Sequence, residues 1–521
     1  MKDKNYFPLF MLIAVAFGVL LGTTLNFYTE IPILVGNKSE NKIKKLLQFI
    51  EQEYVDNIDT DSVLDDVITE IVANLDPHSV YFPKEIYAAS KENLQGNFEG
   101  IGVQFFMHQD SLVVTHILSG GPSETAGILA GDRILIADKD TLYGKNMRSR
   151  DIVKILKGPT NTKVDLQIYR KGIENLIMVT LRRNKVPIQS AKVAYMINDS
   201  LGYLKLDRFA ATSYHEVNSK LLQLKAEGAK NLVFDLRQNG GGFIHIANAI
   251  IDEFIPEGKL IVFTENNKSI KEEFYATEEG VFEEANIYVL IDEGSASASE
   301  IFAGAFQDND QGTIIGRRSF GKGLVQREMK LGDGSAVRLT IARYYTPTGR
   351  SIQKPYSLND VASYANDYKN RVLRGELLHK DSIKVYDSLK FTTPKGKVVY
   401  GGGGIIPDVF VAVDTTSYIE NEYFSKINSF TFEYADDNRN ELLEQGFEDY
   451  DLNTEQQKNI LEVFLSETNL ERNVSAEKKA LLSHYLKALI ARQIFDETSF
   501  SKINDRRDPM LLKVIELDSI Q

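Results

Sequence analysis

The sequence predicts a multidomain protein of mixed α/β class, and three observations support this fold class. The chain has 521 residues, which is too long for a single hydrophobic core. Its composition, 43% hydrophobic and 26% charged, is typical of globular protein. Apolar residues follow helical spacing near both ends and form short strand-like runs in between. We therefore expect five segments with these bounds: 1–30, 31–87, 88–185, 186–415 and 416–521.

Composition also excludes several classes of function. A net charge of −13 argues against nucleic acid as a partner. The chain has no cysteine, which excludes thiol catalysis, structural disulfides and a lipoprotein anchor. Its seven histidines show no paired metal-ligand spacing, so we expect neither a metal nor another cofactor.

The first segment, residues 1–30, reads as a short cytoplasmic tip and a transmembrane signal anchor. Residues 5–29 carry no charge and are long enough to cross a bilayer of about 30 Å as a helix. Because Lys2 and Lys4 precede this stretch, the rest of the chain is expected on the periplasmic side of the inner (cell) membrane. A cleaved signal peptide is the alternative, but no clean Ala-x-Ala site follows, so we favour a retained single-pass anchor.

Residues 31–87 read as a small helical domain. Its apolar positions, such as Ile43, Leu46, Leu47 and Ile50, follow helical spacing. We expect this domain to serve packing or dimerisation rather than chemistry.

Residues 88–185 alternate short strands with a single helix. Strands are expected at 112–114, 133–136 and 164–169, and a helix at 151–156. This order suits a PDZ-like module, which is a peptide-binding fold.

The peptide-binding loop of this module would be Gly100, Ile101, Gly102 and Val103. Glycines let the backbone turn its N–H groups inward, so that the free C-terminus of a peptide can be held there. The peptide chain would then add a strand beside residues 103–106. A simple β-turn is the alternative interpretation of an isolated Gly-x-Gly.

Residues 186–415 read as an α/β core. After a linker at 185–187, strands are expected at 201–206, 231–235 and 287–291, alternating with helices. A charged, partly helical stretch at 355–397 reads as an insertion or a lid.

Ser297 is the most informative residue of this core. It lies in the small-residue run 294–300, after the expected strand at 287–291 and before an expected helix at 301–306. A helix N-terminus favours negative charge, which suits a serine losing its proton and an oxyanion forming beside it. An N-cap serine among small packing neighbours is the plainer alternative.

Lys322 follows 25 residues after Ser297, between two glycines and beside apolar neighbours. A lysine acts as a base at neutral pH only when it loses its proton, and an ordinary lysine has a pKa of about 10.4. Burial could lower this pKa by roughly 3 units. A surface lysine beside a turn is the alternative.

Several motifs in this order resemble the carboxyl-terminal processing peptidases, also called tail-specific proteases. The resemblance covers roughly residues 40 to 415 and is most specific around Ser297 and Lys322. The matching stretches are Leu75-Asp76-Pro77-His78-Ser79, 100–103, Asp235-Leu236-Arg237 leading into 240–242, 294–301, 319–326, 343–353 and 403–409. The family is one of PDZ-containing serine endopeptidases with a Ser-Lys dyad, so the resemblance implies capture and cleavage of exported proteins with free, unstructured C-terminal tails.

The resemblance also implies roles for single residues. Ser297 would be the nucleophile, Lys322 the general base and Gln326 the side chain that orients the lysine. The oxyanion hole would combine the N–H of Ala298 with one from the pair Gly241 and Gly242. This loop departs from the family pattern, because the chain has Asn-Gly-Gly-Gly at 239–242 where the family usually has Asn-Pro-Gly-Gly.

Two other catalytic arrangements can be weighed against the dyad. Ser319 and Lys322 fit the Ser-x-x-Lys spacing of penicillin-binding proteins, but the Ser-Asp-Asn and Lys-Thr-Gly tripeptides that accompany it are absent from the sequence. A Ser-His-Asp triad would use His245 and Asp235. His245 lies in an apolar run, so we interpret it as a packed or capping histidine.

The last segment, 416–521, shows helical stripes at 460–465 and 481–490, which are typical of a core or a dimer surface. A homodimer is therefore plausible. A non-catalytic PDZ adaptor that binds the C-termini of exported proteins is the alternative function, and binding of a non-peptide ligand on the same fold is a weaker one.

Overall fold

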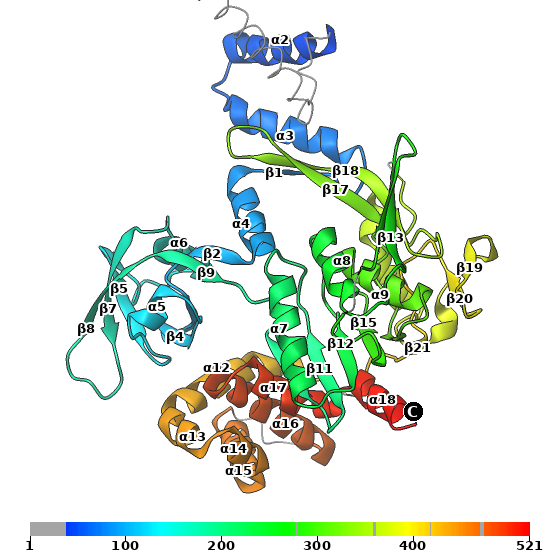
Figure 1. The fold of residues 1–521 in the computed structure, drawn as a ribbon. Coiled ribbons are helices and arrows are strands. Elements are labelled where there is room, and N and C mark those ends of the chain that lie inside the picture. The colour runs from blue at the N-terminus through cyan, green and yellow to red at the C-terminus, as the bar shows by residue number, and fades with distance from the viewer. Residues whose placement is uncertain (1–37, 278–279, 358–360, 417, 469–473, 521) are drawn as a thin grey trace, which may run out of the picture. The chain divides into compact units, whose positions relative to one another are not determined.

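The structure is a computed structural model that describes residues 38–277, 280–357, 361–416, 418–468 and 474–520 (Figure 1). The segment interpreted as a transmembrane anchor lies outside these residues. Within them, no helix has both the length and the apolar character that crossing a bilayer requires. The chain divides into two units, residues 1–71 and 72–521, and each is described by itself.

The first unit is helical where it is described. It contains α2 (Lys38–Glu53) and most of α3 (Thr60–Ala73), as the apolar spacing predicts. The apolar side chains of Leu46 and Phe49 on α2 are 58% and 65% exposed.

The small module in the second unit is a six-stranded sheet with two helices. Its strands run in the order β3-β4-β5-β7-β8, with β6 paired to β5, so β3 is an edge strand of this sheet. The elements are β3 (Val103–His108), β4 (Ser111–Ile117), α5 (Pro122–Thr125), β5 (Arg133–Ala137), β6 (Asp140–Thr141), α6 (Ser149–Leu156), β7 (Lys163–Tyr169) and β8 (Ile177–Arg182). The three strands and the helix predicted at 151–156 are confirmed, whereas the expectation of a single helix is wrong, because Pro122–Thr125 form a second, one-turn helix.

The prediction of a linker at Lys185–Pro187 is wrong. These residues belong to β9 (Asn184–Pro187), which pairs antiparallel with β2 (Asn97–Gly100). The chain therefore enters and leaves the module as a two-stranded ribbon. Val186 is fully buried, because pairing turns its side chain inward.

The core of the second unit is a mostly parallel sheet in the order β10-β11-β12-β15-β16-β21 (Figure 1). Only the β10–β11 pair is antiparallel. Its strands are β10 (Val193–Met196), β11 (Leu201–Lys205), β12 (Asn231–Asp235), β15 (Ile287–Ile291), β16 (Thr313–Gly316) and β21 (Val409–Phe410). The predicted α/β core is confirmed in these elements.

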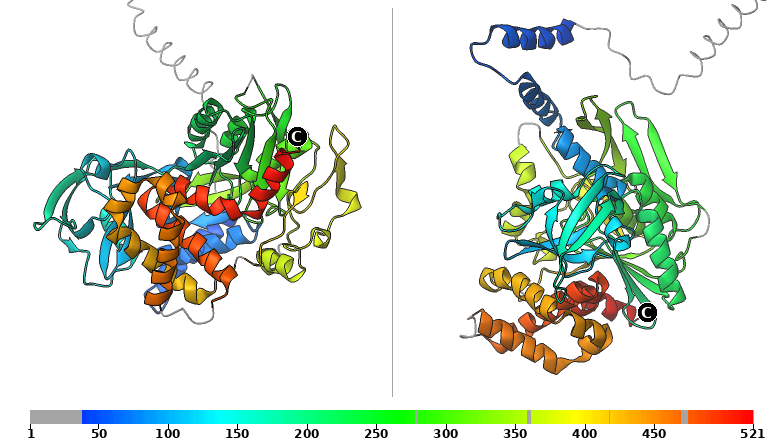
Figure 2. Two further views of the ribbon diagram at one scale, coloured as in Figure 1. Left: turned by 90° about the horizontal axis from the view of Figure 1, so that it is seen from below. Right: turned by 90° about the vertical axis from the view of Figure 1, so that its left-hand side faces the viewer.

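Helices cover both faces of this sheet. One cluster of buried side chains joins alternate strand residues, such as Phe234, to α7 (Ser213–Ala226), α8 (Ile244–Asp252) and α9 (Ala298–Asp308). The other face, which includes Val233, packs against α18 (Pro509–Asp518) at the red end of the chain in Figures 1 and 2. The last helix is therefore part of the core of the α/β domain.

A second, antiparallel sheet lies beside the core and carries the segment after Lys322. It runs β1-β18-β13-β14, and β17 pairs with β18. The elements are β1 (Val80–Phe82), α4 (Lys84–Gln95), β13 (Leu260–Asn266), β14 (Lys271–Tyr275), β17 (Leu324–Lys330) and β18 (Ala336–Tyr345). The stretch at 355–397 is partly helical, as predicted, with α10 (Val361–Ala365), α11 (Asp367–Leu373), two short 3-10 turns at Lys380–Ser382 and Asp387–Leu389, and β19 (Lys390–Thr392), which pairs with β20 (Val398–Tyr400).

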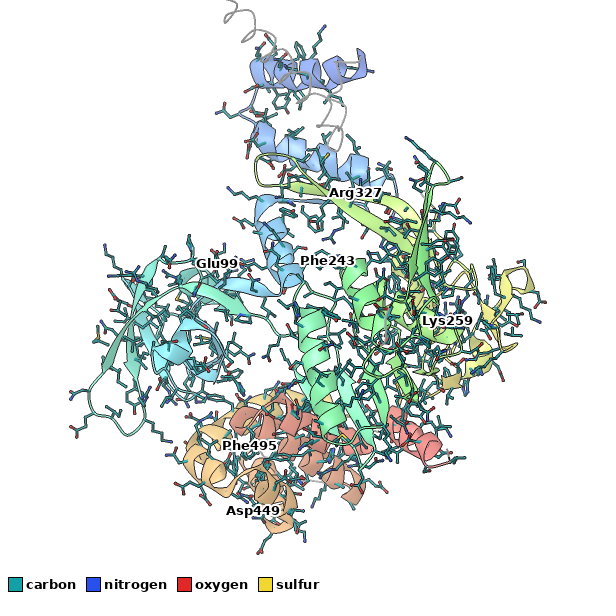
Figure 3. All side chains as sticks on the ribbon, in the orientation of Figure 1. Glu99, Phe243, Lys259, Arg327, Asp449 and Phe495 are labelled. Carbon is teal, nitrogen blue, oxygen red and sulfur yellow. The ribbon has the colours of Figure 1, made fainter. Side chains whose placement is uncertain are left out.

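The C-terminal region is helical before it reaches α18. Its helices are α12 (Asn421–Asp437), α13 (Arg439–Gln445), α14 (Phe447–Leu452), α15 (Thr454–Glu467), α16 (Ala476–Ile494), α17 (Glu497–Asn504) and a 3-10 turn at Asp505–Arg507. Phe495, which is labelled in Figure 3, lies in this region. Its ring packs against those of Phe447 and Tyr450. The predicted helical stripes thus form a separate buried cluster. The five domain boundaries themselves stay predictions.

Candidate active site

Ser297 lies at the turn between β15 and α9, as the sequence predicts. It is the residue before α9, with φ +58° and ψ −113°. A positive φ is uncommon for a residue with a side chain and costs of order 1–3 kcal/mol, so the surrounding structure must hold this conformation. Such strain is typical of a functional turn.

The glycine loop after β12 lies directly against Ser297. A Cβ added to Gly241 would stand 2.8 Å from Cβ of Ser297 and 2.9 Å from the amide nitrogen of Ala298. Gly241 also has φ +99°. A side chain at this position would be strained and would collide with the turn at Ser297, which explains why glycine is required here.

The two glycines of the pair differ in the use of their N–H groups. The N–H of Gly241 donates to Oδ1 of Asn239 at 2.9 Å. Within the described part of the chain, no hydrogen bond uses the N–H of Gly242. Of the two, Gly242 is therefore the one whose donor is not already engaged.

Lys322 is held by a neutral amide. Its Nζ donates to Oε1 of Gln326 at 2.9 Å, and Nε2 of Gln326 donates to the backbone carbonyl of His78. Burial, followed by the positive charge of Arg338, lowers the pKa of Lys322 to about 8. In the residues that the structure describes, no hydrogen bond joins the Ser297 hydroxyl to Lys322. Catalytic hydrogen bonds often form fully only when substrate is bound.

Glu300 links the two candidate catalytic residues, and the sequence analysis missed it. Its fully buried carboxylate accepts four hydrogen bonds. Oε2 accepts from the N–H groups of Ser297 at 2.9 Å and of Lys322 at 2.8 Å. Oε1 accepts from the hydroxyl of Ser319 at 2.5 Å and from the N–H of Gly321 at 2.7 Å. The spacing Ser-x-x-Glu from 297 to 300 is a capping-box signal that could have identified it.

Tyr344 on β18 makes a second link between the same two residues. Its buried hydroxyl lies 3.1 Å from the carbonyl oxygen of Ser297 and 2.6 Å from that of Lys322, in position to donate to either. Tyr344 lies in the matching stretch 343–353, but the sequence analysis gave it no role. Together with Glu300, it fixes the backbones of both residues.

The motif at 75–79 supports the site through its backbone. Asp76 is buried and accepts from the N–H groups of His78 and Ser79 and from the hydroxyl of Thr340 on β18. This turn presents the carbonyl of His78 to Gln326. Burial, followed by the charge of Lys322, lowers the pKa of His78 to about 4, so its imidazole is neutral at pH 7.

Ser319 and Asp235, which belong to the two alternative catalytic arrangements, are engaged in other hydrogen bonds. Ser319 is fully buried, and its hydroxyl donates to Glu300 and accepts from the N–H of Ile405. Asp235 is bound by the guanidinium of Arg237 and by the hydroxyl of Tyr203. Neither residue is available as a nucleophile or as a triad carboxylate.

The expectation that His245 is a packed or capping histidine is wrong. Its side chain is exposed on the first turn of α8. Its ring lies 5.3 Å from that of Phe243, centroid to centroid. The apolar run 243–246 misled the interpretation because α8 is amphipathic there and turns position 245 to solvent.

The PDZ-loop residues lie in the small module, not in the core that holds Ser297. Gly100 ends β2 and Val103 begins β3, so the loop joins the ribbon to the edge strand. Gly102 has φ +84°, and a Cβ on it would stand 3.0 Å from Gly121. Ile101 is buried in the core of the module.

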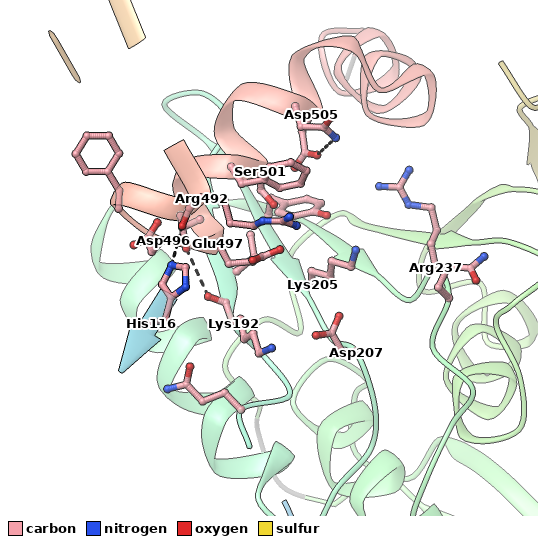
Figure 4. Close-up of a pocket in the computed structure, with 18 of the residues that line it drawn as sticks. His116, Lys192, Lys205, Asp207, Arg237, Arg492, Asp496, Glu497, Ser501 and Asp505 are labelled. Carbon is pink, nitrogen blue, oxygen red and sulfur yellow. Dashed lines mark hydrogen bonds between the residues drawn. The ribbon is translucent and has the colours of Figure 1, made fainter. Parts of the chain in front are cut away.

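The second unit contains a cavity of about 1300 Å³, which Ser297 and Lys322 do not line. Residues of the module, the core and the C-terminal helices surround it, with charges of both signs (Figure 4). Among them, His116 contacts the carbonyl of Arg492 through Nε2 at 2.8 Å. Gln238, next to the glycine loop, also lines it.

Comparison with known proteins gives the site its context. Residues 200–363 match Peptidase family S41, residues 100–181 match the PDZ domain, and residues 424–496 match a family of unknown function (DUF8443). A carboxy-terminal-processing protease of Bartonella bacilliformis is 32% identical over 346 residues, which are 64% of this chain and 78% of the relative. The carboxy-terminal processing protease CtpA of Bacillus subtilis is 30% identical over 393 residues, 74% of this chain and 82% of the relative. A solved structure described as the photosystem II D1 C-terminal processing protease is 25% identical and covers 72% of this chain and 87% of its own, with a TM-score of 0.36.

The fold and the sequence matches define a serine-type peptidase with a PDZ domain. The chain belongs to the family of carboxy-terminal processing proteases. The expected resemblance is thereby confirmed, and the protease interpretation is supported over the non-catalytic adaptor.

We predict that Glu300→Gln weakens the site, because an amide cannot accept at both of its ends. One pair of donors, either on Oε1 or on Oε2, would face an NH₂ group and lose its acceptor. Each buried donor left unpaired costs about 1–3 kcal/mol. Urea unfolding should show a loss of about 2 kcal/mol or more in the free energy of unfolding.

The matched control is Glu284→Gln, which removes the same charge at an exposed position. Its effect should stay within about 0.5 kcal/mol. Equal stability of the two variants would contradict the anchoring function of Glu300.

Proposed function

We propose that Ser297 is the nucleophile, Lys322 its general base and Gln326 the side chain that orients the base. The observation that carries this proposal is the shared anchor described above: one oxygen of Glu300 accepts the backbone N–H groups of both Ser297 and Lys322. Two residues 25 positions apart are thereby held together at the N-terminus of α9. The lowered pKa of Lys322 and the strained turn at Ser297 support the same roles.

The reaction begins when neutral Lys322 takes the proton of the Ser297 hydroxyl. The serine oxygen attacks a peptide carbonyl carbon, and the carbonyl oxygen becomes an oxyanion. The N–H of Ala298 and that of Gly242 or Gly241 donate to this oxyanion; Gly242 is favoured because the Gly241 N–H is already bonded to Asn239. Losing one such donor typically costs about 100- to 1,000-fold in kcat.

The intermediate then collapses. Protonated Lys322 gives its proton to the leaving amine, the C–N bond breaks, and an acyl-enzyme remains on Ser297. Lys322 next takes a proton from water, which attacks the ester carbon. The bond to the serine oxygen then breaks, Lys322 returns the proton to this oxygen, and the acid leaves. No metal takes part in these steps, so chelators should leave the rate unchanged.

The substrate is proposed to be a protein with a free, unstructured C-terminal tail. The tail carboxylate would be held at residues 100–103, and the tail would add as a strand to the free edge of β3. The edge position of β3 and the positive φ of Gly102 support this. Residue preferences of the tail are set by side chains along this edge.

We predict that the full chain cleaves an unfolded reporter ending in an apolar residue, and that it cleaves the same reporter ending in an amide less well. The amide loses the charge-assisted hydrogen bonds of the carboxylate, so KM should rise about 10-fold or more. Ser297→Ala and Lys322→Ala should each lower kcat by at least about 1,000-fold. Unchanged cleavage by Ser297→Ala would contradict the assignment of Ser297 as the nucleophile.

We predict that the rate follows the deprotonation of Lys322. Because only the neutral amine is a base, kcat/KM should rise with pH through about 8 and level off above about 9. At pH 7 about a tenth of the maximal rate should remain. An inflection near 6.5 would instead point to a histidine base. His78, with its pKa near 4, does not contribute in this range.

A single-pass anchor at residues 1–30 is proposed to hold the peptidase on the periplasmic side of the inner membrane. The uncharged stretch 5–29 and the preceding Lys2 and Lys4 support it. Alkaline carbonate should leave the full chain in the membrane fraction; its release would contradict the anchor. A homodimer through the helical ends is proposed as well, and sedimentation of the detergent-extracted chain tests it.

A further inference from the structure

The segment that carries Lys322 has no regular secondary structure, yet its backbone is fully engaged. Five successive N–H groups, of residues 319–323, all donate hydrogen bonds. The first two donate to the carbonyls of Ile405 and Ser295. Those of 321 and 322 donate to the two oxygens of Glu300, and that of 323 donates to Oε1 of Gln353. A buried polar backbone without partners would cost several kcal/mol, so this satisfaction is what allows an irregular loop to be rigid. The carbonyl groups of the same segment need donors, and these come from elsewhere.

One guanidinium supplies the donors for the first two of them and for the carbonyl of Arg318 just before. Arg371 on α11 donates from Nη1 to the carbonyl of Ser319 at 2.8 Å and to that of Arg318 at 3.3 Å. Its Nη2 donates to the carbonyl of Phe320 at 3.0 Å. Three successive carbonyls directly before Gly321-Lys322 therefore point at one side chain.

Arg371 is itself fixed. It is 2% exposed, and its Nε lies 2.9 Å from Oδ2 of Asp367 one turn earlier on α11. The carboxylate of Glu376, just beyond the helix, forms two hydrogen bonds with Arg318, at 2.6 and 2.8 Å. An arginine fork is suited to this arrangement because its planar donors reach several acceptors at fixed angles.

Phe320, the aromatic residue of the loop, is contacted from the same part of the chain. Nζ of Lys354 lies 3.9 Å from the ring centroid of Phe320 and 4.1 Å from that of Tyr364 on α10. The hydroxyl of Tyr364 lies 2.5 Å from Nε2 of His78. The stretch 361–397 thus contacts the Lys322 loop through Arg371 on α11 and through Tyr364 on α10, whose ring lies 6.2 Å from that of Phe320, centroid to centroid.

We infer that Arg371 is a positioning residue of the reaction: it holds the carbonyls of 318–320 so that Lys322 stays withdrawn from water and aimed at Ser297. This inference rests on the proposed roles of Ser297 and Lys322. On this inference, the segment 355–397 supports the loop that carries Lys322 and does not act as a lid. Arg371 acts through the loop and touches neither substrate nor reacting atoms.

Burial and the charged groups that face Lys322 determine how its pKa would change if the loop were loosened. They are Arg338 on β18, Glu300 on α9, and Asp76 with neutral His78 in the turn before β1. Burial is the largest influence on the pKa of Lys322. Access of water would therefore return the pKa of Lys322 from about 8 toward its ordinary 10.5.

The test measures the second-order rate at which a fluorophosphonate labels the full chain, as a function of pH. In this reaction the serine oxygen forms a bond to phosphorus, fluoride leaves, and the proton passes to Lys322. Labelling does not need capture of a tail, so it reports on the nucleophile and base alone. Dividing by the final labelled fraction removes any contribution from unfolded protein.

Arg371→Met should move the inflection of this profile to higher pH by at least 1 unit. The labelling rate at pH 7 should then fall about 10-fold or more and recover in part above pH 9. Arg371→Lys keeps the charge but loses the fork, so its inflection should also move, by less. Arg374→Met is the matched control, because Arg374 is exposed and lies 3.9 Å from Glu376 without contacting the loop carbonyls; its profile should equal that of the wild type.

Two results would overturn the inference. One is an unchanged inflection in Arg371→Met, which would reduce Arg371 to a structural residue. The other is full restoration by Arg371→Lys, which would assign the effect to charge. Failure of the proposed function looks different: the wild type would not label at Ser297, or Lys322→Ala would label as fast as the wild type.

Discussion

The carboxylate of Glu300 must accept four hydrogen bonds, because a fully buried charge without partners would cost more free energy than the fold can supply. Its donors come from two segments that are separate in sequence, the N-terminus of α9 and the loop that carries Lys322. Satisfying this one group therefore requires the two segments to meet. The turn at Ser297, the loop that carries Lys322 and the sheets that present them all depend on that meeting.

The same interaction explains how the pKa of Lys322 can be lowered beside a carboxylate. An ion pair with Glu300 would hold the pKa of the lysine near or above its ordinary value. Backbone N–H groups and the Ser319 hydroxyl already occupy the carboxylate oxygens, so Nζ turns to the neutral amide of Gln326. Burial then outweighs the attraction of Glu300, and the pKa of Lys322 falls. Burial also raises the pKa of Glu300 itself, and its hydrogen bonds oppose this rise.

Local patterns in the sequence predicted the parts of the site that local forces determine. The apolar run at 287–291 and the small residues after it were enough to place Ser297 between a strand and a helix. Arg371, Tyr344 and the ribbon strand at 184–187 were missed or misread, because each owes its function to a partner far along the chain. Periodicity carries no information about such pairings. Glu300 is the exception, since its capping-box spacing was present in the sequence.

The glycine loop shows how this chain can depart from the family pattern without losing order. A proline before the two glycines would stiffen the loop, and this chain has the exposed Gly240 there. Asn239 supplies the missing constraint: its side chain donates to the carbonyl of Leu206 and accepts from Gly241, while its own carbonyl accepts from Ala296 and Ser299. Because Ala296 and Ser299 lie close to Ser297 in the chain, these hydrogen bonds join the loop to the turn at Ser297. The N–H groups of Gly241 and Gly242 therefore keep their position relative to Ser297, whichever residue precedes them.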